Sequence, residues 1–262
     1  MQNGYSKNTA GFSRVLLNFN PLQNKKCGMN YSDLQPTTTR AEELLLALYA
    51  IEATATALPG EIDFNFKMIT EDGAVYLLKI SRPNADENYL DFQKELTQHI
   101  ATTTTNNHTP QLIQDSKKQD ISSYKDLSGQ QRKVRLHTWV SGRVWSTVNP
   151  QLDDLRHDLG QNCGVLTCAL QGFSHSEASR AFEWDVAQSL WTKKHLSLFS
   201  EEEKALVYYF QERFESEKAS YDLLRKSVVH NDVNDNNILV SKELTAPKVT
   251  AIIDYGDAIH TQ

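Results

Sequence analysis

The most constraining feature of the sequence is a polar loop held between two short apolar runs. Residues 230–237 read His-Asn-Asp-Val-Asn-Asp-Asn-Asn, with two valines before them and Ile-Leu-Val after them. Short apolar runs bounded by polar residues are typical of buried strands. The sequence therefore predicts polar side chains on a loop whose two ends are firmly held, a common setting for catalytic groups.

The types of residue in this loop indicate a particular chemistry. Asp232 is followed five positions later by Asn237, and another apolar run, 249–253, ends at Asp254. Phosphoryl transfer needs a carboxylate that accepts the proton of the attacking hydroxyl, together with oxygen ligands for a metal ion. Carboxylate and amide oxygens suit Mg²⁺ better than zinc or copper. We predict Asp232 as the catalytic base, and Asn237 and Asp254 as the Mg²⁺ ligands.

A simpler interpretation of the loop is a turn, because Asn and Asp side chains bond to their own backbone. The presence of Asp254 after the next apolar run makes this interpretation weaker. His230, at the start of the loop, is predicted to brace it rather than to carry a proton.

The composition excludes several classes of protein. A net charge of -6 argues against a nucleic-acid partner, because proteins that bind the phosphate backbone generally show a basic face. No run approaches the roughly 20 apolar residues needed to cross a bilayer, so no membrane partner is expected. The three cysteines do not form a dense pairing pattern, which favours a reducing compartment. We predict a cytoplasmic protein.

The spacing of apolar residues in the first part of the chain predicts an antiparallel sheet with one main helix. Residues 41–58 predict a helix, 62–70 and 74–80 a hairpin, and 89–100 a second helix; 112–116, 121–124 and 133–140 predict further strands.

The second part of the chain predicts mainly helices. Apolar residues recur at helical spacing over 152–170 and 201–224, and the short apolar runs beside the polar loops are the only predicted strands. The predicted organisation is a poorly ordered leader over 1–36, a nucleotide-binding lobe over 37–140 and a catalytic lobe over 141–262.

These motifs resemble the aminoglycoside phosphotransferase and choline kinase superfamily, a branch of the protein-kinase-like fold. The resemblance rests on the His-x-Asp-x-x-x-x-Asn loop and on the later Asp-Tyr-Gly-Asp over 254–257. Segments 58–66, 75–80 and 173–185 are similar to the hydroxylysine kinase type within that superfamily. The resemblance covers about residues 37 to 260 and implies a two-lobed α+β fold, with an antiparallel-sheet N-lobe and an α-rich C-lobe.

The resemblance also implies a nucleotide site that takes ATP or GTP. Lys79 would hold the α- and β-phosphates and pair with Glu95, although Asp86, Glu87 and Asp91 are nearby alternatives to Glu95. The turn from Asp63 to Phe66 would cover the phosphates, and the backbone around 136–140 would hold the base. The side chains assigned to this site are Lys79, Glu95, Asp63, Asn65, Phe66 and Trp139.

Two features depart from the family pattern. Asn231 stands where the hydroxylysine kinase and aminoglycoside branches typically have Gly. Choline and ethanolamine kinases resemble this chain in having Asn at that position. Asn tolerates a positive φ better than most residues, so the fold is expected to persist. In addition, such kinases normally continue well past the position of Asp257, so the C-lobe is expected to be truncated at its C-terminus.

The predicted function is transfer of the terminal phosphoryl group of ATP or GTP to a hydroxyl of a small amine or amino acid, with a hydroxylysine-like acceptor preferred. The acidic balance suits such a cationic acceptor. A choline- or ethanolamine-like acceptor, an aminoglycoside, or a catalytically impaired nucleotide-binding module are the alternatives. The sequence makes no prediction of oligomeric state.

Overall fold

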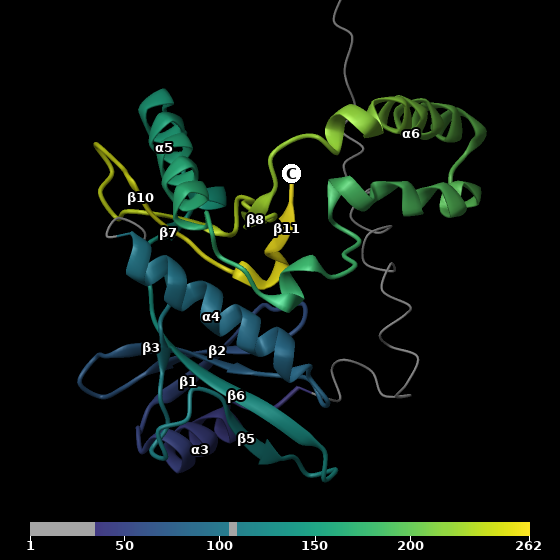
Figure 1. Ribbon diagram of the computed structural model, residues 1–262. Coiled ribbons are helices and arrows are strands. Elements are labelled where there is room, and N and C mark those ends of the chain that lie inside the picture. Colours follow the sequence, from purple (N-terminus) through teal and green to yellow (C-terminus); the bar gives the residue numbers. More distant parts are fainter. Residues whose placement is uncertain (1–34, 105–108) are drawn as a thin grey trace, which may run out of the picture. The chain divides into compact units, whose positions relative to one another are not determined.

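A computed structural model gives the structure of the chain and describes residues 35–104 and 109–262. The predicted leader, 1–36, lies almost entirely outside these residues, as does Cys27. Residues Thr38–Gln262 form one compact unit, shown in Figure 1. No helix in the described ranges combines the length and the apolar character that a membrane span requires.

A six-stranded antiparallel sheet forms the first lobe. Its strands are β1 (Thr54–Leu58), β2 (Phe64–Ile69), β3 (Val75–Ile80), β4 (Leu112–Ile113), β5 (Ser122–Lys125) and β6 (Gln131–Thr138). They follow the order β1-β2-β3-β6-β4, while β5 pairs with the first half of β6. The predicted hairpin is confirmed, with Gly73 at φ 87° in its turn.

The two faces of this sheet differ in character because side chains alternate along each strand. Along β2 the side chains of Phe64, Phe66 and Met68 are buried in the core. The other face carries Asn65 opposite Lys79, and Lys79 opposite Arg135, in three neighbouring strands. The register therefore places two cations and one amide side by side.

The helix predicted over 41–58 is too long. Helix α3 (Thr38–Tyr49) ends where Ala50 adopts a φ of 56°, and residues Thr54–Leu58 form strand β1. Threonines favour strands, and the full length of β1 pairs with β2, which overrides the helical spacing further upstream. The side chain of Glu42 also accepts a hydrogen bond from the Ala55 amide at 2.8 Å, which joins α3 to β1.

Helix α4 (Glu87–Thr103) connects the sheet to the second lobe. The carboxylate of Asp86 caps it by accepting from the amides of residues 88 and 89. Its apolar side chains Phe92, Leu96 and Ile100 are buried against Leu166, Leu170, Val228, Ile252 and Tyr255, which belong to the second lobe. Figure 1 shows α4 above the sheet and α3 below it.

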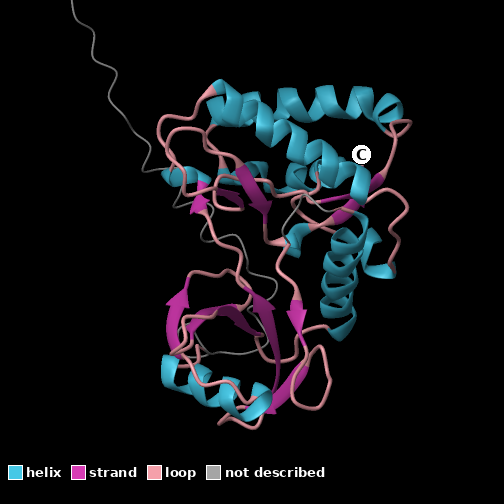
Figure 2. Cartoon of the chain, turned by 90° about the vertical axis from the view of Figure 1, so that its left-hand side faces the viewer, coloured by secondary structure: helices cyan, strands magenta, loops and turns pink. Residues whose placement is uncertain are grey.

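The second lobe is rich in helices, and Figure 2 shows them gathered on one side of the unit. Its elements are β7 (Arg143–Val144), η2 (Trp145–Thr147), α5 (Asp153–Ala169), η3 (Ser176–Ser179), η4 (Val186–Leu198), α6 (Glu201–Tyr221), β8 (Ser227–Val229), β9 (Ile238–Val240), β10 (Val249–Ile252), η5 (Tyr255–Asp257) and β11 (Ile259–Thr261). Strands β10-β9-β7 form one small sheet and β11-β8 another. These two small sheets hold the polar loops of the site.

Candidate active site

The polar loop between β8 and β9 is braced by His230. Its imidazole is buried, with Nε2 donating to the Ile253 carbonyl oxygen at 3.0 Å and Nδ1 accepting from the Asp232 amide at 3.2 Å. These two bonds fix the neutral tautomer with its proton on Nε2. Burial lowers the pKa of His230, which favours the same neutral form. His230 thus ties the loop to the residue that precedes Asp254.

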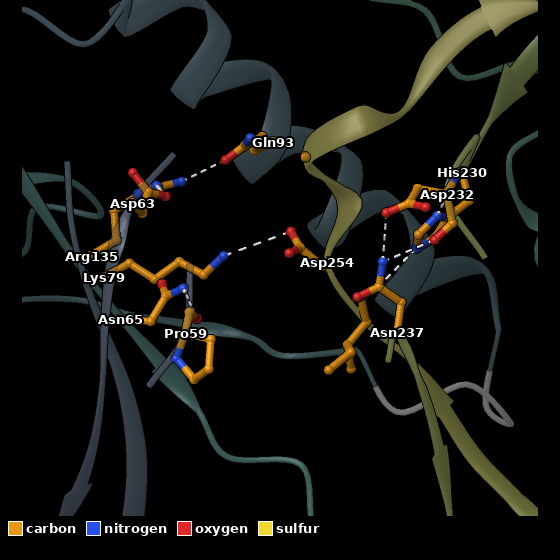
Figure 3. A network of polar contacts seen from close by, with 12 residues as sticks. Pro59, Asp63, Asn65, Lys79, Gln93, Arg135, His230, Asp232, Asn237 and Asp254 are labelled. Carbon is orange, nitrogen blue, oxygen red and sulfur yellow. Dashed lines mark hydrogen bonds and ion pairs between the residues drawn. The ribbon is translucent and has the colours of Figure 1, made fainter. Parts of the chain in front are cut away.

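The side chains of Asp232 and Asn237 contact each other directly (Figure 3). The Nδ2 of Asn237 donates to Oδ2 of Asp232 at 2.8 Å and to its carbonyl oxygen at 2.9 Å. Asn234 donates to Oδ1 of Asp232, also at 2.8 Å. Because the nitrogen of the Asn237 amide is used in this way, the oxygen is the atom of this side chain that could bind a cation.

Two residues of the site have left-handed backbone conformations. Asn231 lies at φ 64° and Asp254 at φ 63°. Asn and Asp are enriched in this region because their short polar side chains bond locally. The conformation of Asn231 is therefore one that Asn and Gly adopt more readily than most residues.

Asp254 lies opposite Lys79 of β3, with 3.8 Å between Nζ and Oδ1 (Figure 3). The lysine side chain is mostly buried, whereas that of Asp254 is 56% exposed. The structure thus brings together a cation from the sheet and a carboxylate from the second lobe. The exposed carboxylate of Asp254 and the amide oxygen of Asn237 are hard ligands, so these residues fit a Mg²⁺ ion.

Asp257 adds a further carboxylate to this region. Burial raises its pKa to about 6, and the negative charges of Asp232 and Asp254 act in the same direction, while Arg180 opposes them. The site therefore carries excess negative charge, which a bound cation would offset.

The predicted pairing of Lys79 with Glu95 is wrong. Lys79 contacts Asp254, and the exposed carboxylate of Glu95 lies on another face of α4, within 4.8 Å of ligand atoms of Asp91 and His175. The α4 residue that reaches Arg135, the neighbour of Lys79 in the sheet, is Gln93, two positions earlier and about 200° around the helix. The sequence spacing alone did not reveal which helix face the second lobe would bury.

Arg135 of β6 is a site residue that the sequence analysis missed. Its guanidinium donates to Oε1 of Gln93 at 2.6 Å and pairs with the carboxylate of Asp63, and both partners in the ion pair are largely buried. An arginine inside the apolar run of a predicted strand was the available signal. Asp63 therefore has a cationic partner within the protein, in addition to its predicted place near the phosphates.

The turn that was predicted to cover the phosphates is tightly built. Asn65 donates to the carbonyl oxygen of Pro59 at 3.1 Å. A Cβ at Gly60 would collide with the carbonyl oxygen of Asp63 and with Nδ2 of Asn65, so only glycine fits there. Phe66 is fully buried in the sheet core, so the prediction that it covers the phosphates is wrong for its side chain.

The end of β6 carries the residues predicted to hold the nucleotide base. Trp139 follows the strand, and Nζ of Lys67 lies 5.0 Å from the centre of its ring. Two positions earlier, His137 is buried, and within the described part of the chain neither of its ring nitrogens has a hydrogen-bond partner. Burial, with the charges of Arg135 and Lys79, holds the pKa of His137 well below its usual value. No motif in the sequence distinguishes this neutral histidine.

Comparison with known proteins agrees with this geometry. The model of the APH phosphotransferase enzyme family matches residues 54–260. The chain belongs to this family. A curated relative, the hydroxylysine kinase of Mus musculus, is 22% identical over 254 residues, which cover 84% of this chain and 64% of the relative. The chain thus spans just under two-thirds of that relative's length.

Solved structures of other kinases share the fold. A microcompartment-associated aminopropanol kinase superposes with a TM-score of 0.67 at 17% identity, covering 86% of this chain and 70% of the kinase chain. Amicoumacin kinase in complex with AMP-PNP, Ca²⁺ and Ami gives 0.63 at 15% identity, covering 87% and 66%. These likenesses, with the family match and the curated relative, confirm the predicted superfamily, the similarity to the hydroxylysine kinase type and the two-lobed α+β fold.

Proposed function

We propose that this phosphotransferase-family chain moves the terminal phosphoryl group of ATP or GTP to a hydroxyl of a small amine or amino acid, with a hydroxylysine-like acceptor. The observation that carries the proposal is the approach of Lys79 to Asp254 at 3.8 Å, beside the hydrogen-bonded pair of Asp232 and Asn237. These groups come from separate parts of the sequence, and together they match the requirements of phosphoryl transfer.

Each residue has a distinct role in this proposal. Asp232 accepts the proton of the acceptor hydroxyl, and its bonds from Asn234 and Asn237 fix the direction of its carboxylate. Asn237 and Asp254 hold Mg²⁺, which when bound neutralises charge on the phosphates. Lys79 holds the α- and β-phosphates.

The remaining nucleotide contacts involve the first lobe. Backbone of Asp63 and of the first residues of β2, 64–66, covers the phosphates, while Arg135 holds the side chain of Asp63 and the Pro59 carbonyl holds that of Asn65. Trp139 and the neighbouring backbone hold the base. Glu95 has no place in this arrangement, because it is exposed on another face of α4.

The acceptor is proposed from the charge of the site. The carboxylates of Asp232, Asp254 and Asp257 interact with one another, and their combined negative charge favours an acceptor with an ammonium group. The named activities of the hydroxylysine and aminopropanol kinases are consistent with a small amine. Amino alcohols and aminoglycosides are the alternative acceptors. We expect the reaction to take place in the cytoplasm. The boundary between the nucleotide-binding lobe and the catalytic lobe is proposed near residue 140.

The first test is turnover with a panel of hydroxylated amines in the presence of Mg²⁺ and ATP or GTP. Asp232→Asn should lower turnover by about 10²- to 10⁴-fold, because it removes the base, while AMP-PNP should still raise the melting temperature. Asp235→Asn, an exposed residue in the same loop, serves as the control and should keep full turnover.

A wild-type chain that binds AMP-PNP but transfers no phosphate to any amine would contradict the enzymatic proposal. That result would support a nucleotide-binding module in its place. A chain that neither nucleotide nor Mg²⁺ stabilises would contradict both.

A further inference from the structure

The proposed reaction gives no role to the 173–185 segment, which links α5 to η4. This segment includes η3 and Arg180, and its residues were among those that resembled the hydroxylysine kinase type. In the structure the short helix η3 of this segment contacts both α4 and β11. The proposed reaction alone does not explain why the 173–185 segment makes these contacts.

Arg180 donates hydrogen bonds to the backbone that follows Asp254. Its Nη1 lies 2.8 Å from the Ala258 carbonyl oxygen, and Nη2 lies 3.4 Å from that of Gly256. A third bond, from Nη1 to the Glu177 carbonyl oxygen at 3.1 Å, holds the guanidinium to its own segment. One side chain thus joins η3 to the loop that carries a proposed metal ligand.

Three aromatic rings hold the guanidinium in place. Its central carbon lies 5.0 Å from the ring centre of Tyr89, 5.6 Å from that of Phe92 and 4.9 Å from that of Phe182. Tyr89 and Phe92 belong to α4, and the hydroxyl of Tyr89 also donates to the Gly256 carbonyl oxygen. Cation–π contacts and shared hydrogen bonds together fix both the arginine and the loop.

Asp254 needs such support because its backbone is left-handed and its carboxylate is largely exposed. A non-glycine residue keeps such a conformation only where its surroundings fix it. On the upstream side, the Ile253 amide donates to the Asn237 carbonyl oxygen at 2.8 Å, and His230 holds the Ile253 carbonyl. On the downstream side, the bonds from Arg180 and Tyr89 provide the corresponding support.

Other contacts of the 173–185 segment are also structural. Buried Asp185 accepts from the hydroxyl of Thr261 in β11 at 2.9 Å, so the segment also holds the strand after the loop. Asp91, Glu95 and His175 have the composition of a metal site. However, Nδ1 of His175 accepts from the Glu177 amide at 3.1 Å, which leaves the proton on the nitrogen that faces Asp91, and Lys94 already pairs with Asp91.

We infer that Arg180 is a positioning residue for Asp254: it holds the backbone of residues 256–258 so that the carboxylate of Asp254 faces Lys79 and the proposed metal position. This inference rests on the proposed function. It extends that function by assigning the 173–185 segment a role in metal binding without direct contact with the metal.

The test compares Arg180→Gln and Arg180→Lys with a matched control, Arg143→Gln. Arg143 also donates to two backbone carbonyls of the second lobe, those of Ser241 and Glu243 at 2.9 and 3.0 Å, but these carbonyls follow β9 and not Asp254. The two readouts are Mn²⁺ binding by calorimetry in the presence of AMP-PNP, and amide hydrogen exchange of residues 255–258 without nucleotide.

Arg180→Gln should weaken Mn²⁺ binding by about 10- to 100-fold and speed exchange at 255–258, with Arg180→Lys intermediate because an ammonium can keep one bond. Exchange in β9 should be unchanged, which shows that the variant is folded. Arg143→Gln should alter neither readout. Wild-type Mn²⁺ affinity and exchange in both Arg180 variants would overturn the inference, as would an equal loss in Arg143→Gln.

If the wild-type chain itself does not bind Mn²⁺ with AMP-PNP, the proposed function is wrong, and hydrogen exchange alone decides the role of Arg180. Faster exchange confined to 255–258 would then support the positioning of the loop. Unchanged exchange would overturn it.

Discussion

At the scale of single residues, the site consists of polar groups whose positions are set by backbone contacts. His230 is neutral, and its two ring nitrogens form hydrogen bonds with the Asp232 amide and the Ile253 carbonyl oxygen. His137 is also neutral, but its ring nitrogens are buried without partners among the described residues.

The pKa of Asp257 predicts a dependence of stability on pH. Its folded pKa, about 6, lies above the ordinary value of 3.8, so the folded state holds this proton more tightly than the unfolded state. Ionised Asp257 therefore destabilises the fold, increasingly from about pH 4 and fully above about pH 6. Asp257→Asn removes this cost and should raise the melting temperature more at pH 7.5 than at pH 4.5.

Thermal unfolding at the two pH values measures this difference directly. Asp235→Asn removes the same charge from an exposed position and serves as the control, with a much smaller difference expected. An equal gain at both pH values for Asp257→Asn would contradict the prediction.

At the scale of elements, α4 connects three parts of the molecule through side chains that lie three or four residues apart on one side of the helix. Gln93 contacts Arg135 in the sheet, Phe92 packs into the core of the second lobe, and Tyr89 holds the loop after Asp254. Because one helix makes all these contacts, its rotation about its own axis decides which side chains reach the site. Figure 1 shows α4 between the two lobes.

The ion pair of Arg135 and Asp63 offers a test at this scale. Arg135→Leu leaves the carboxylate of Asp63 buried without its cation, which should lower the free energy of unfolding by about 3–5 kcal/mol. It should also weaken AMP-PNP binding. Arg135 contacts both Asp63 and Gln93, so without it the residues proposed to cover the phosphates are no longer held to α4. Urea unfolding and calorimetry measure the two effects.

A second pair on β6 supplies the matched control. Arg132 and Asp126 are equally buried, with 2.8 Å between Nε and Oδ2, but they lie at the opposite end of the strand from Trp139. Arg132→Leu should therefore destabilise the fold to a similar degree and leave the affinity of the folded protein for AMP-PNP unchanged. Equal losses of affinity in both variants would show that the Asp63–Arg135 pair has no specific effect on the site.

At the scale of the whole molecule, η4 and α6 expose an unusual amount of apolar surface. Large side chains that are at least half exposed here include Val186, Leu198, Leu206, Tyr209 and Phe210. The only buried side chain of α6 is Gln211, and this helix makes its main contacts with η4. Leu206, Tyr209 and Phe210 are three or four residues apart and so lie on one face of α6. An exposed apolar face of this kind promotes association or dye binding.

The double variant Leu206→Glu/Phe210→Glu should reduce both properties. These residues are 60% and 62% exposed and lie one helical turn apart, so the change should affect the melting temperature little. Binding of a hydrophobic dye and size-exclusion chromatography with light scattering measure the effect. Ser216→Glu/Ser220→Glu adds the same charge elsewhere on α6, and an equal reduction by this control would contradict the role assigned to the apolar face.

The sequence by itself determined those parts of the site whose residues are close together in the chain. The loop over 230–237, its flanking strands, the hairpin with Lys79 and the apolar run before Asp254 all follow local patterns, because turn residues and short-range periodicity act within a few residues. These patterns were sufficient to identify the family and the two-lobed fold.

The tertiary structure decided which side chains meet. Gln93, and not Glu95, is the α4 residue that contacts Arg135, and Arg135 lies beside Lys79 in the sheet. Helix α3 ends at Tyr49, and residues 54–58 form a strand. The tertiary structure also gave Arg180 its contacts with the loop after Asp254. Each of these outcomes depends on strand register or on which face of a helix is buried. Both are set by packing between segments far apart in the chain, which no local pattern records.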